Sequence, residues 1–374
     1  MKKERIALNA LMGAGGWTGG LYYIRNIAYM LASNSSIVNR YDIYLFAEAE
    51  LNDYYKDLPS AVNIVKTNGF SNSKLKAAYI FVKYKIKYVF PIGRGIGSLF
   101  YKPIRWIPDF QHNYYPQLFE EKETLHRTEL YSQYGIESIP VVLSSNSSKK
   151  DFYDNYKVCN QHVAVVPFVS YIEPMIRNLS IEREKSILDK HNLNGMAYAC
   201  VMNQFWRHKN HIVVLNAMKL YYKKNLDSNF KFVFTGKLED YRCPEYIEKL
   251  KTLFEDEIIK QHSVLLGFID RDEQIAIMKN SEYVIQPSLF EGWGTVVEDA
   301  KVLDKTILLS DIPVHQEQKN GKCILFDPDN PQDLADLIEQ ENSKKHVDNI
   351  EEGIADMQVR AKEYSKAFQK LLDM

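Results

Sequence analysis

Four basic side chains crowd one short turn, residues 203–211 (NQFWRHKNH). They are Arg207, His208, Lys209 and His211, and a helical pattern follows them. Cations at a helix N-terminus oppose the helix dipole, so they make sense where an anion binds and outweighs the repulsion. A diphosphate would fit, because fixed backbone N–H groups and one or two mobile cations can share its charge. The alternative is a solvated basic turn.

A second turn, within residues 288–305 (SLFEGWGTVVEDAKVLDK), joins glycines to acidic residues. Gly292 and Gly294 can present backbone N–H groups to a ligand, and a helical pattern begins at Thr295. Because an apolar run comes before the turn, we expect these groups at the end of a strand.

Three carboxylates accompany this second turn: Glu291, Glu298 and Asp299. The helix dipole favours acids near a helix start, so capping is the alternative, which explains one acid well and three poorly. Carboxylates also accept hydrogen bonds from vicinal hydroxyls, as in ribose recognition. A turn that offers N–H groups to phosphate and carboxylates to hydroxyls suits a nucleotide-sugar.

A glycine-rich segment, residues 13–26 (GAGGWTGGLYYIRN), also follows a strand pattern and opens a helical one. Counted from Gly13, the fingerprint G-x-G-x-x-G would need its third glycine at Thr18, and the chain has no P-loop motif. The NAD hypothesis is therefore weakened and the P-loop is excluded. A phosphate or sugar contact and a flexible turn remain as interpretations.

Residues 107–116 (IPDFQHNYYP) supply His112 near Asp109 and three aromatic side chains. His112 could be a general base or an orienting donor. The alternative is a structural histidine. The segment reads as a polar turn between two prolines that faces a cleft, which favours a functional role.

Lysines and aromatic residues alternate in residues 74–88 (KLKAAYIFVKYKIKY). The lysines, with Tyr79, Phe81 and Tyr84, could rest on an anionic membrane surface. The alternative is a solvated helix with its apolar face in the core. Nucleic-acid binding has no other support, and the net charge of −1 gives no general attraction to nucleic acid.

The elements that must position these residues alternate between strand and helix patterns, which predicts parallel sheets with crossover helices. We expect strands within residues 5–11, 41–47, 62–67, 87–92, 103–109, 140–146, 163–168, 197–203, 230–236, 263–269, 282–288, 305–311 and 323–328. We expect helices within residues 21–34, 210–225, 271–280 and 295–305 and from residue 351 onward. Ligands of such sheets bind beyond the carboxyl ends of the strands, where the informative turns lie.

Length and composition predict an ordinary globular protein of two domains, because 374 residues with 45% hydrophobic side chains build ample core. We predict Rossmann-like domains over residues 1–170 and 171–350, and a C-terminal helix over 351–374 that packs toward the first. The four cysteines have no metal-ligand spacing and read as reduced thiols of a cytosolic protein. We expect no secretion signal and no membrane span.

Several motifs resemble those of retaining GT-B glycosyltransferases of family four, in particular the bacterial surface-polysaccharide members. EGWGTVVEDAKVLDKTI is similar to EGFGLPVLEAMACGKPV, and KTILLSDIPVHQEQ is similar to KPVIASDIPALRE. CILFDPDNPQDLADLI and WIPDFQHNYYPQLF resemble further segments of that family. The similarity spans nearly the whole chain and is most specific in its second half.

The resemblance implies an α/β fold of GT-B architecture, with two Rossmann-like domains facing a central cleft. It implies retaining transfer of a sugar from a nucleotide-sugar donor to a saccharide or lipid-linked saccharide acceptor in surface-polysaccharide synthesis. We therefore expect a cytoplasmic protein that can lie on the inner face of the plasma membrane.

The resemblance also implies roles for single residues. Glu291 would lie near the donor sugar, and His112 would help to place that sugar. The donor-binding residues would be Gly19, Gly20, Arg207, Lys209, Gly292, Trp293, Gly294, Thr295, Glu298 and Asp299. Among them, Lys209 would bind the diphosphate and Asp299 the ribose.

Two departures from the family pattern concern single positions. Asp299 stands where a glutamate is usual, so Glu298 could hold the ribose instead. The family's arginine falls on Gln204, and Arg207 could supply its charge.

The expected mechanism is a front-face transfer, in which cations offset the charge that develops on the leaving phosphate. Because the β-phosphate oxygen can take the acceptor proton, neither a dedicated base nor a metal ion or other cofactor is expected. One rival is a sugar-nucleotide epimerase or inverting transferase that uses His112 and Asp109. The other is an inactive nucleotide-sugar-binding scaffold.

Overall fold

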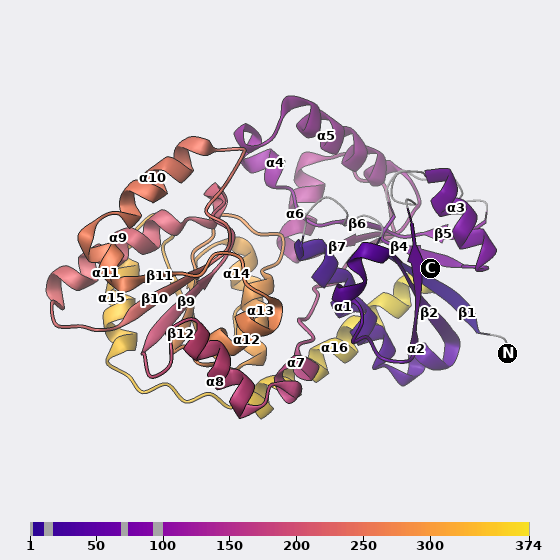
Figure 1. Cartoon of the computed structure of the whole chain (residues 1–374). Coiled ribbons are helices and arrows are strands. Elements are labelled where there is room, and N and C mark those ends of the chain that lie inside the picture. Colours follow the sequence, from indigo (N-terminus) through magenta and orange to yellow (C-terminus); the bar gives the residue numbers. More distant parts are fainter. Residues whose placement is uncertain (1–2, 11–17, 69–73, 93–99, 374) are drawn as a thin grey trace. The chain divides into compact units, whose positions relative to one another are not determined.

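The computed structural model describes residues 3–10, 18–68, 74–92 and 100–373, which form two compact units (Figure 1). Unit 1 comprises residues 1–116, 120–171 and 358–374, and unit 2 comprises residues 117–119 and 172–357.

Parallel strands build two sheets in unit 1. The strands are β1 (Glu4–Asn9), β2 (Tyr41–Glu48), β3 (Val62–Thr67), β4 (Tyr88–Phe90), β5 (Lys102–Pro103), β6 (Arg105–Ile107), β7 (Val141–Leu143) and β8 (Val163–Val165). One sheet has the order β3-β2-β1-β4-β5 and the other the order β6-β7-β8. In the first, β1 and β2 pair in register from Glu4 opposite Tyr41 to Asn9 opposite Phe46.

Short connections join these strands to the helices of unit 1. The helices are α1 (Thr18–Ala32), α2 (Ser35–Arg40), η2 (Ala49–Tyr54), α3 (Lys74–Lys83), α4 (Gln111–Tyr114), α5 (Glu121–Ile136) and α6 (Asn146–Asn155). The first turn of α6 shows why it starts where it does, because the Ser145 hydroxyl accepts a hydrogen bond from the Ser148 backbone N–H at 2.9 Å.

Unit 2 contains one parallel sheet of order β11-β10-β9-β12-β13-β14. Its strands are β9 (Tyr198–Met202), β10 (Lys231–Thr235), β11 (Ser263–Leu265), β12 (Tyr283–Gln286), β13 (Thr306–Ser310) and β14 (Cys323–Phe326). β9 and β12 are buried along their whole length, as is typical of parallel strands covered on both faces. The strand order reverses between these two strands, which makes their carboxyl ends the expected ligand site.

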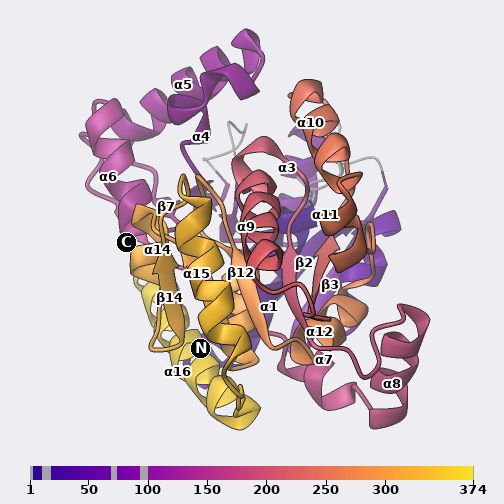
Figure 2. The same ribbon diagram turned by 90° about the vertical axis from the view of Figure 1, so that its left-hand side faces the viewer.

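Helices cover the sheet of unit 2. They are α7 (Glu173–Asn178), α8 (Ile181–Lys190), η4 (Arg207–Lys209), α9 (His211–Lys224), α10 (Pro244–Phe254), α11 (Glu257–His262), α12 (Arg271–Lys279), α13 (Thr295–Val302), α14 (Pro313–Gln318) and α15 (Pro331–Asn342). Figure 2 shows α15 beside α9, although more than 100 residues separate them in the chain.

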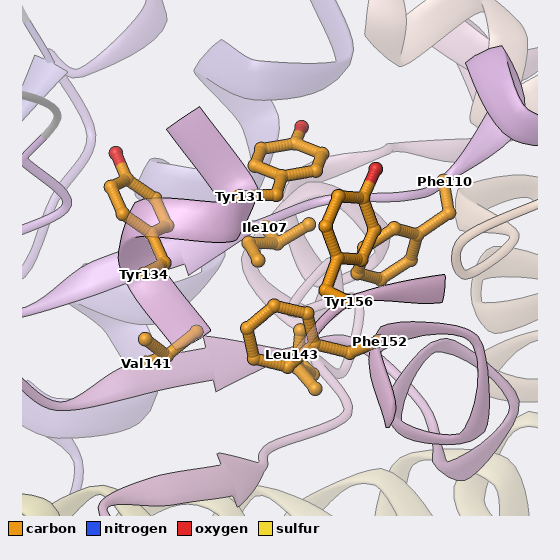
Figure 3. Close-up of a cluster of buried hydrophobic side chains, with 8 residues drawn as sticks. All are labelled: Ile107, Phe110, Tyr131, Tyr134, Val141, Leu143, Phe152 and Tyr156. Carbon is orange, nitrogen blue, oxygen red and sulfur yellow. The ribbon is translucent and has the colours of Figure 1, made fainter. Parts of the chain in front are cut away.

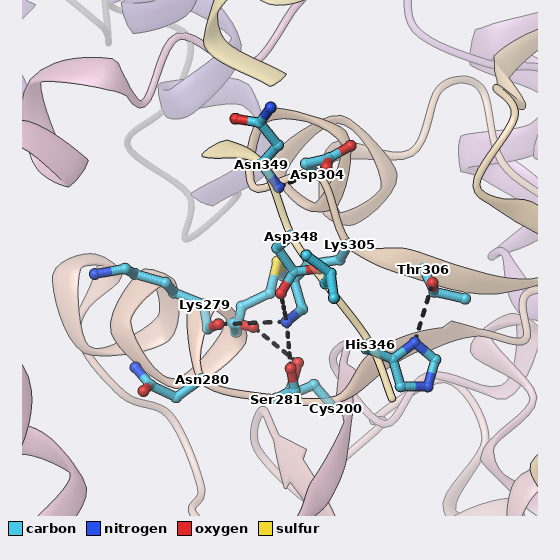
Figure 4. A network of polar contacts seen from close by, with 12 residues as sticks. Cys200, Lys279, Asn280, Ser281, Asp304, Lys305, Thr306, His346, Asp348 and Asn349 are labelled. Carbon is cyan, nitrogen blue, oxygen red and sulfur yellow. Dashed lines mark hydrogen bonds and ion pairs between the residues drawn. The ribbon is translucent and has the colours of Figure 1, made fainter. Parts of the chain in front are cut away.

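A buried lysine fastens the segment that leads into the last helix, α16 (Ile350–Leu372). The Lys305 side chain is 2% exposed, and its Nζ donates to the carbonyl oxygens of Lys279 and Ser281 and pairs with the Asp348 carboxylate at 2.5 Å (Figure 4). Since an ammonium group is costly to bury unless it is paired, these contacts fix the chain just before α16.

The later part of α16 belongs to unit 1. Ser365 Oγ donates to the Met30 carbonyl at 2.8 Å, and the Phe368 ring packs against Phe90 with 5.1 Å between centroids. The helix that the sequence predicts from residue 351 is confirmed.

The predicted α/β class with parallel sheets is confirmed as well. Several helices were not predicted from the sequence. Among them are α5 and α6, whose segments are mostly polar, and the amphipathic helices α8, α10 and α15. In the described ranges, no helix combines the length and apolar character needed to cross a bilayer.

Candidate functional site

The loops that follow β9 and β12 meet at the point where the strand order of the unit 2 sheet reverses. Asn203 Nδ2, just after β9, donates to Gln286 Oε1, at the end of β12, at 2.9 Å. The Leu289 backbone N–H donates to the His208 carbonyl at 2.8 Å. The two turns that the sequence analysis selected are therefore joined directly.

An ion pair lies at the centre of this junction. Lys209 Nζ donates to Glu291 Oε1 at 2.5 Å, and the two side chains are only 14% and 10% exposed. The same carboxylate oxygen accepts hydrogen bonds from Gln286 Nε2 at 2.9 Å and from Ser288 Oγ at 2.7 Å. The sequence prediction singled out Lys209 and Glu291, and the structure brings them into contact.

Gln318, which the sequence analysis missed, fixes the glycine turn before α13. Its Oε1 accepts from the Gly294 backbone N–H at 3.1 Å, and its Nε2 donates to the Gly294 carbonyl at 2.7 Å. Nε2 also donates to Glu298 Oε1 at 3.0 Å, and Lys301 Nζ lies 3.3 Å from the same oxygen. Glu298 is fully buried, so these contacts tie α13 to α14.

The other selected residues of this segment vary in accessibility. Gly292 and Trp293 are half-buried in the turn, and Thr295 begins α13. Asp299 is fully buried in the next turn and pairs with Arg271, the first residue of α12. The carboxylate predicted to hold ribose thus already has a cationic partner.

Two of the four basic residues in the first turn are not cations. His208 and His211 are 5% and 0% exposed. Burial, followed by the charge of Lys209, holds the pKa of His208 well below its usual range and lowers the pKa of His211 to about 3. The cations of this turn are therefore Arg207 and Lys209, and the expectation that all four basic residues lie at the start of one helix is wrong. The basic residues up to Lys209 form η4, and α9 begins only at His211.

Arg207 and a second arginine flank the turn. Arg207 is exposed, with its Nη1 at 3.8 Å from Cys243 Sγ, and its backbone N–H donates to Asp240 Oδ2 at 3.2 Å. Arg242 Nε donates to Asp240 Oδ1 at 3.1 Å, and its guanidinium lies 4.9 Å from the centre of the Trp206 ring. Arg242 was not predicted from the sequence, although it lies in the connection after β10.

Two further buried residues, Ser310 and His315, support the second turn. Ser310 Oγ donates to the Ser288 carbonyl at 2.6 Å, and His315 Nδ1 lies 2.9 Å from the Ser310 carbonyl oxygen. Burial lowers the pKa of His315 to about 4, against the opposing charge of Glu291. The imidazole is thus neutral and structural here. This role of His315 could not be predicted from the sequence, because the segment reads as an ordinary strand-to-helix connection.

His112 belongs to a different environment, in unit 1. It is 1% exposed in α4, its Nε2 lies 2.9 Å from Tyr156 Oη, and its ring is 5.5 Å from the Tyr131 ring. Both tyrosines are members of the buried cluster in Figure 3. Burial, helped by the charge of Arg127, lowers the pKa of His112 to about 4. The prediction of a polar turn is wrong at this point, because Phe110 and His112, at the start of α4, are both buried in the core.

The remaining residues that the sequence predicts to bind the donor lie at the start of α1. Gly19 is exposed and Gly20 is buried, both in the first turn of this helix. The glycines of residues 13–17 lie outside the described residues.

Chemically, the Lys209–Glu291 junction offers groups of two kinds. An ammonium group carries three donors, and Glu291 uses one of those of Lys209, so an anionic oxygen could take another. The Glu291 carboxylate can accept hydrogen bonds from hydroxyls. Among the described residues, no group of three or more His, Cys, Asp or Glu side chains is arranged to hold a metal ion.

Comparison with known proteins gives the class of this region. Residues 183–356, which make up most of unit 2, match the family model described as Glycosyl transferases group 1. Unit 2 therefore carries a glycosyl transferases group 1 domain.

Two solved structures and one curated relative resemble the chain more specifically. A glycosyltransferase from Rickettsia africae ESF-5 is 16% identical, with a TM-score of 0.68 over 100% of this chain and 99% of that one. HepE from Anabaena, solved with UDP and glucose, is 15% identical, with a TM-score of 0.69 over 99% of both chains. These likenesses define a GT-B glycosyltransferase fold.

The curated relative is the O-antigen biosynthesis glycosyltransferase WclY of Escherichia coli. It is 35% identical over 72 residues, which make up 19% of this chain and 20% of the relative. The match thus spans about a fifth of the length of that relative.

Proposed function

We propose that the protein is a retaining glycosyltransferase that moves a sugar from a nucleotide-sugar to a saccharide or lipid-linked saccharide in surface-polysaccharide synthesis. The observation that carries the proposal is the Lys209–Glu291 pair, at 2.5 Å, where the strand order of the unit 2 sheet reverses. The group 1 domain supports the nucleotide-sugar donor, and the UDP and glucose bound to HepE favour a uridine nucleotide. The O-antigen relative supports the polysaccharide role.

In the proposed reaction, the bond between the anomeric carbon and the β-phosphate oxygen breaks, and the acceptor oxygen bonds to that carbon on the same face. The acceptor proton passes to the departing phosphate oxygen. Lys209 would offset the charge that grows on the phosphate, and Glu291 would orient the sugar. We propose that no metal ion or other cofactor takes part, so EDTA should leave the transfer rate unchanged.

An epimerase or an inverting transferase would need a firm base. His112 lies 2.9 Å from Tyr156 Oη, and its pKa of about 4 makes it a weak proton acceptor at neutral pH. Both observations favour the retaining reaction over the base-dependent alternative.

We further propose a cytoplasmic protein that rests on the anionic inner face of the plasma membrane through α3. Leu75, Tyr79 and Val82 are 67%, 66% and 43% exposed, at spacings that put them on one face of the helix. Lys76 and Lys83 are exposed on the same short helix. Apolar side chains flanked by lysines are the composition that interfacial helices use.

Binding to vesicles that contain anionic lipid tests the membrane contact. Because each lysine near such a surface contributes about 1 kcal/mol, replacing Lys76, Lys83 and Lys85 with Gln should weaken binding by about 3 kcal/mol. The control replaces Lys249 and Lys251, which are exposed on α10, in the same way. Equal binding by both variants would exclude the α3 contact.

A thermal-shift screen of UDP-, GDP-, dTDP- and CMP-sugars tests the function. A ligand at a hundredfold excess over Kd should stabilise the fold by about 2.7 kcal/mol. We expect one nucleotide class to raise the unfolding temperature of the wild type and Glu291→Ala to respond less. Lys219→Ala is the control, because Lys219 lies on α9 and pairs with Asp256 at the start of α11. NMR of the transferred sugar then gives its anomeric configuration. Stabilisation by a donor without any turnover would favour the inactive nucleotide-sugar-binding scaffold, and no shift with any donor would contradict the proposed function.

A further inference from the structure

Two buried amides lie at the carboxyl ends of neighbouring central strands in unit 2. Asn203 follows β9 and Gln286 ends β12, and they are 7% and 1% exposed. Burying a polar side chain costs free energy unless it is hydrogen-bonded, and an apolar side chain would fill the same space at no such cost. The amides must therefore be explained by what they hold.

The two amides form a chain with a defined direction. Asn203 Nδ2 donates to Gln286 Oε1 at 2.9 Å. This bond turns the other end of the Gln286 amide toward the second turn, where Nε2 donates to Ser288 Oγ at 3.0 Å and to Glu291 Oε1 at 2.9 Å. Because an amide has its acceptor and its donors on opposite sides, a flipped Gln286 would lose its hydrogen bonds with Asn203 and Glu291.

This chain ends on one oxygen of a carboxylate. Glu291 Oε1 accepts from Gln286, from Ser288 and from Lys209. Within the described part of the chain, no hydrogen bond reaches Glu291 Oε2. One oxygen of the carboxylate is therefore held, and the other is available to a ligand.

We propose that Asn203 and Gln286 are positioning residues, which orient the Glu291 carboxylate so that Oε1 keeps Lys209 in place while Oε2 serves the donor sugar. The proposal rests on the proposed glycosyl transfer. Without the amide chain, the carboxylate and its lysine partner lose their fixed orientation. The nucleotide still binds, but the bound sugar is turned over more slowly.

Hydrolysis of the donor tests the proposal without an acceptor. The probe is the nucleotide-sugar that stabilises the wild type in the donor screen, water is the acceptor, and the released nucleoside diphosphate is measured. Gln286→Leu removes a hydrogen bond to a charged group, and Asn203→Ala releases the Gln286 amide that makes it. Each should lower kcat about tenfold, the usual effect of losing such a bond, with KM within about threefold. The double variant should be no slower than Gln286→Leu, because the chain is already broken.

A matched control lies at the other end of the same strand. Tyr283 begins β12, and its hydroxyl donates to Asn342 Oδ1 at 2.9 Å. Tyr283→Phe removes a buried hydrogen bond and should leave kcat unchanged. If Gln286→Leu fails to fold, Gln286→Glu replaces the Nε2 donor at nearly constant size and should show at least the same loss.

Wild-type kcat in the Gln286 variant that folds would overturn the proposal, and so would independent, multiplying losses in the double variant. Either result would leave the proposed function intact, since the wild type turns the donor over. If the wild type neither binds nor hydrolyses any of the nucleotide-sugars, the positioning role and the proposed function are both overturned.

Discussion

The Lys209–Glu291 region of unit 2 and the His112 region of unit 1 both follow strands, and both attract attention in the sequence, but they are built differently. Lys209 and Glu291 come from two loops and meet at 2.5 Å, still partly accessible to solvent. His112 is 1% exposed and lies against Tyr156 and Tyr131, inside an aromatic core.

This contrast shows which residue types are reliable markers of a ligand site. A lysine and a glutamate gain little from burial. Segments that bring them together at the carboxyl ends of central strands therefore indicate a ligand site. An imidazole is largely apolar and packs well against other rings, so a lone histidine near a strand end can belong to the core.

The largest effect should follow from breaking the charged pair in unit 2. Glu291→Gln and Lys209→Ala should each lower the rate of sugar transfer about 10²- to 10³-fold, or about 2.7–4 kcal/mol, as for other groups that stabilise charge in a transition state. Steady-state kinetics with the identified donor measures this.

The control for the charged pair is Lys219→Ala. Lys219, on α9, and Asp256, at the start of α11, pair at 2.6 Å, but their side chains are 31% and 27% exposed. Such a pair contributes at most about 1 kcal/mol to stability, and the transfer rate should not change. Equal losses at Lys209 and Lys219 would mean that the first pair is structural too.

Displacing the backbone of the basic turn, with its charged side chains unchanged, should have the next largest effect. Gly236 has φ +109°, and a Cβ there would lie 2.4 Å from the Asn203 carbonyl oxygen, whereas Gly267 has φ +68° and open space around it. Gly236→Ala should cost about 2–4 kcal/mol of unfolding free energy and weaken nucleotide binding, because the backbone around Asn203 must shift.

Gly267→Ala is the matched control for this prediction. It carries only the strain of the left-handed backbone, about 1–2 kcal/mol, and should bind nucleotide normally. Calorimetry and a nucleotide titration of both variants separate strain from displacement. Nucleotide binding that suffers equally in the two would contradict the role given to the contact between Gly236 and Asn203.

The parallel sheets and the turns at their carboxyl ends could be predicted, because strand and helix periods and strand-end motifs are local features. The partners of the buried acids could not. Glu298 meets Gln318, 20 residues later, and Asp299 meets Arg271, 28 residues earlier. Such contacts depend on which helices become neighbours, which no local spacing encodes. Gln204 is similar, since its side chain accepts from the Lys237 backbone N–H at 2.9 Å.

Buried histidines in unit 2 should make the stability of the protein depend on pH. Burial, followed by the charge of Lys209, lowers the pKa of His211 to about 3, below the 6.5 expected in the unfolded chain. The unfolded state therefore binds the extra proton, so stability is complete above pH 6.5 and falls as the pH drops toward 3. His211→Leu should remove this pH-dependent contribution to the free energy of unfolding, which is up to about 1.4 kcal/mol per pH unit.

Denaturant unfolding of His211→Leu between pH 7.5 and 4.5 checks the slope. His126→Leu is the control, since this side chain is exposed on α5 in the folded protein as it is in the unfolded chain. A wild-type slope in the His211 variant would show that this imidazole takes its proton before unfolding.

The smallest effect should come from the tyrosine that holds His112. Tyr156→Phe removes the hydroxyl 2.9 Å from His112 Nε2 and keeps the ring in the cluster of Figure 3. The free energy of unfolding should fall by about 1 kcal/mol, the usual value of one hydrogen bond. Nucleotide affinity should stay the same, because the nucleotide-binding residues proposed in unit 2 are untouched. If the transfer rate nevertheless falls tenfold or more at constant affinity, the orientation of His112 matters to the reaction, and the aromatic region of unit 1 would have to be counted as part of the working site.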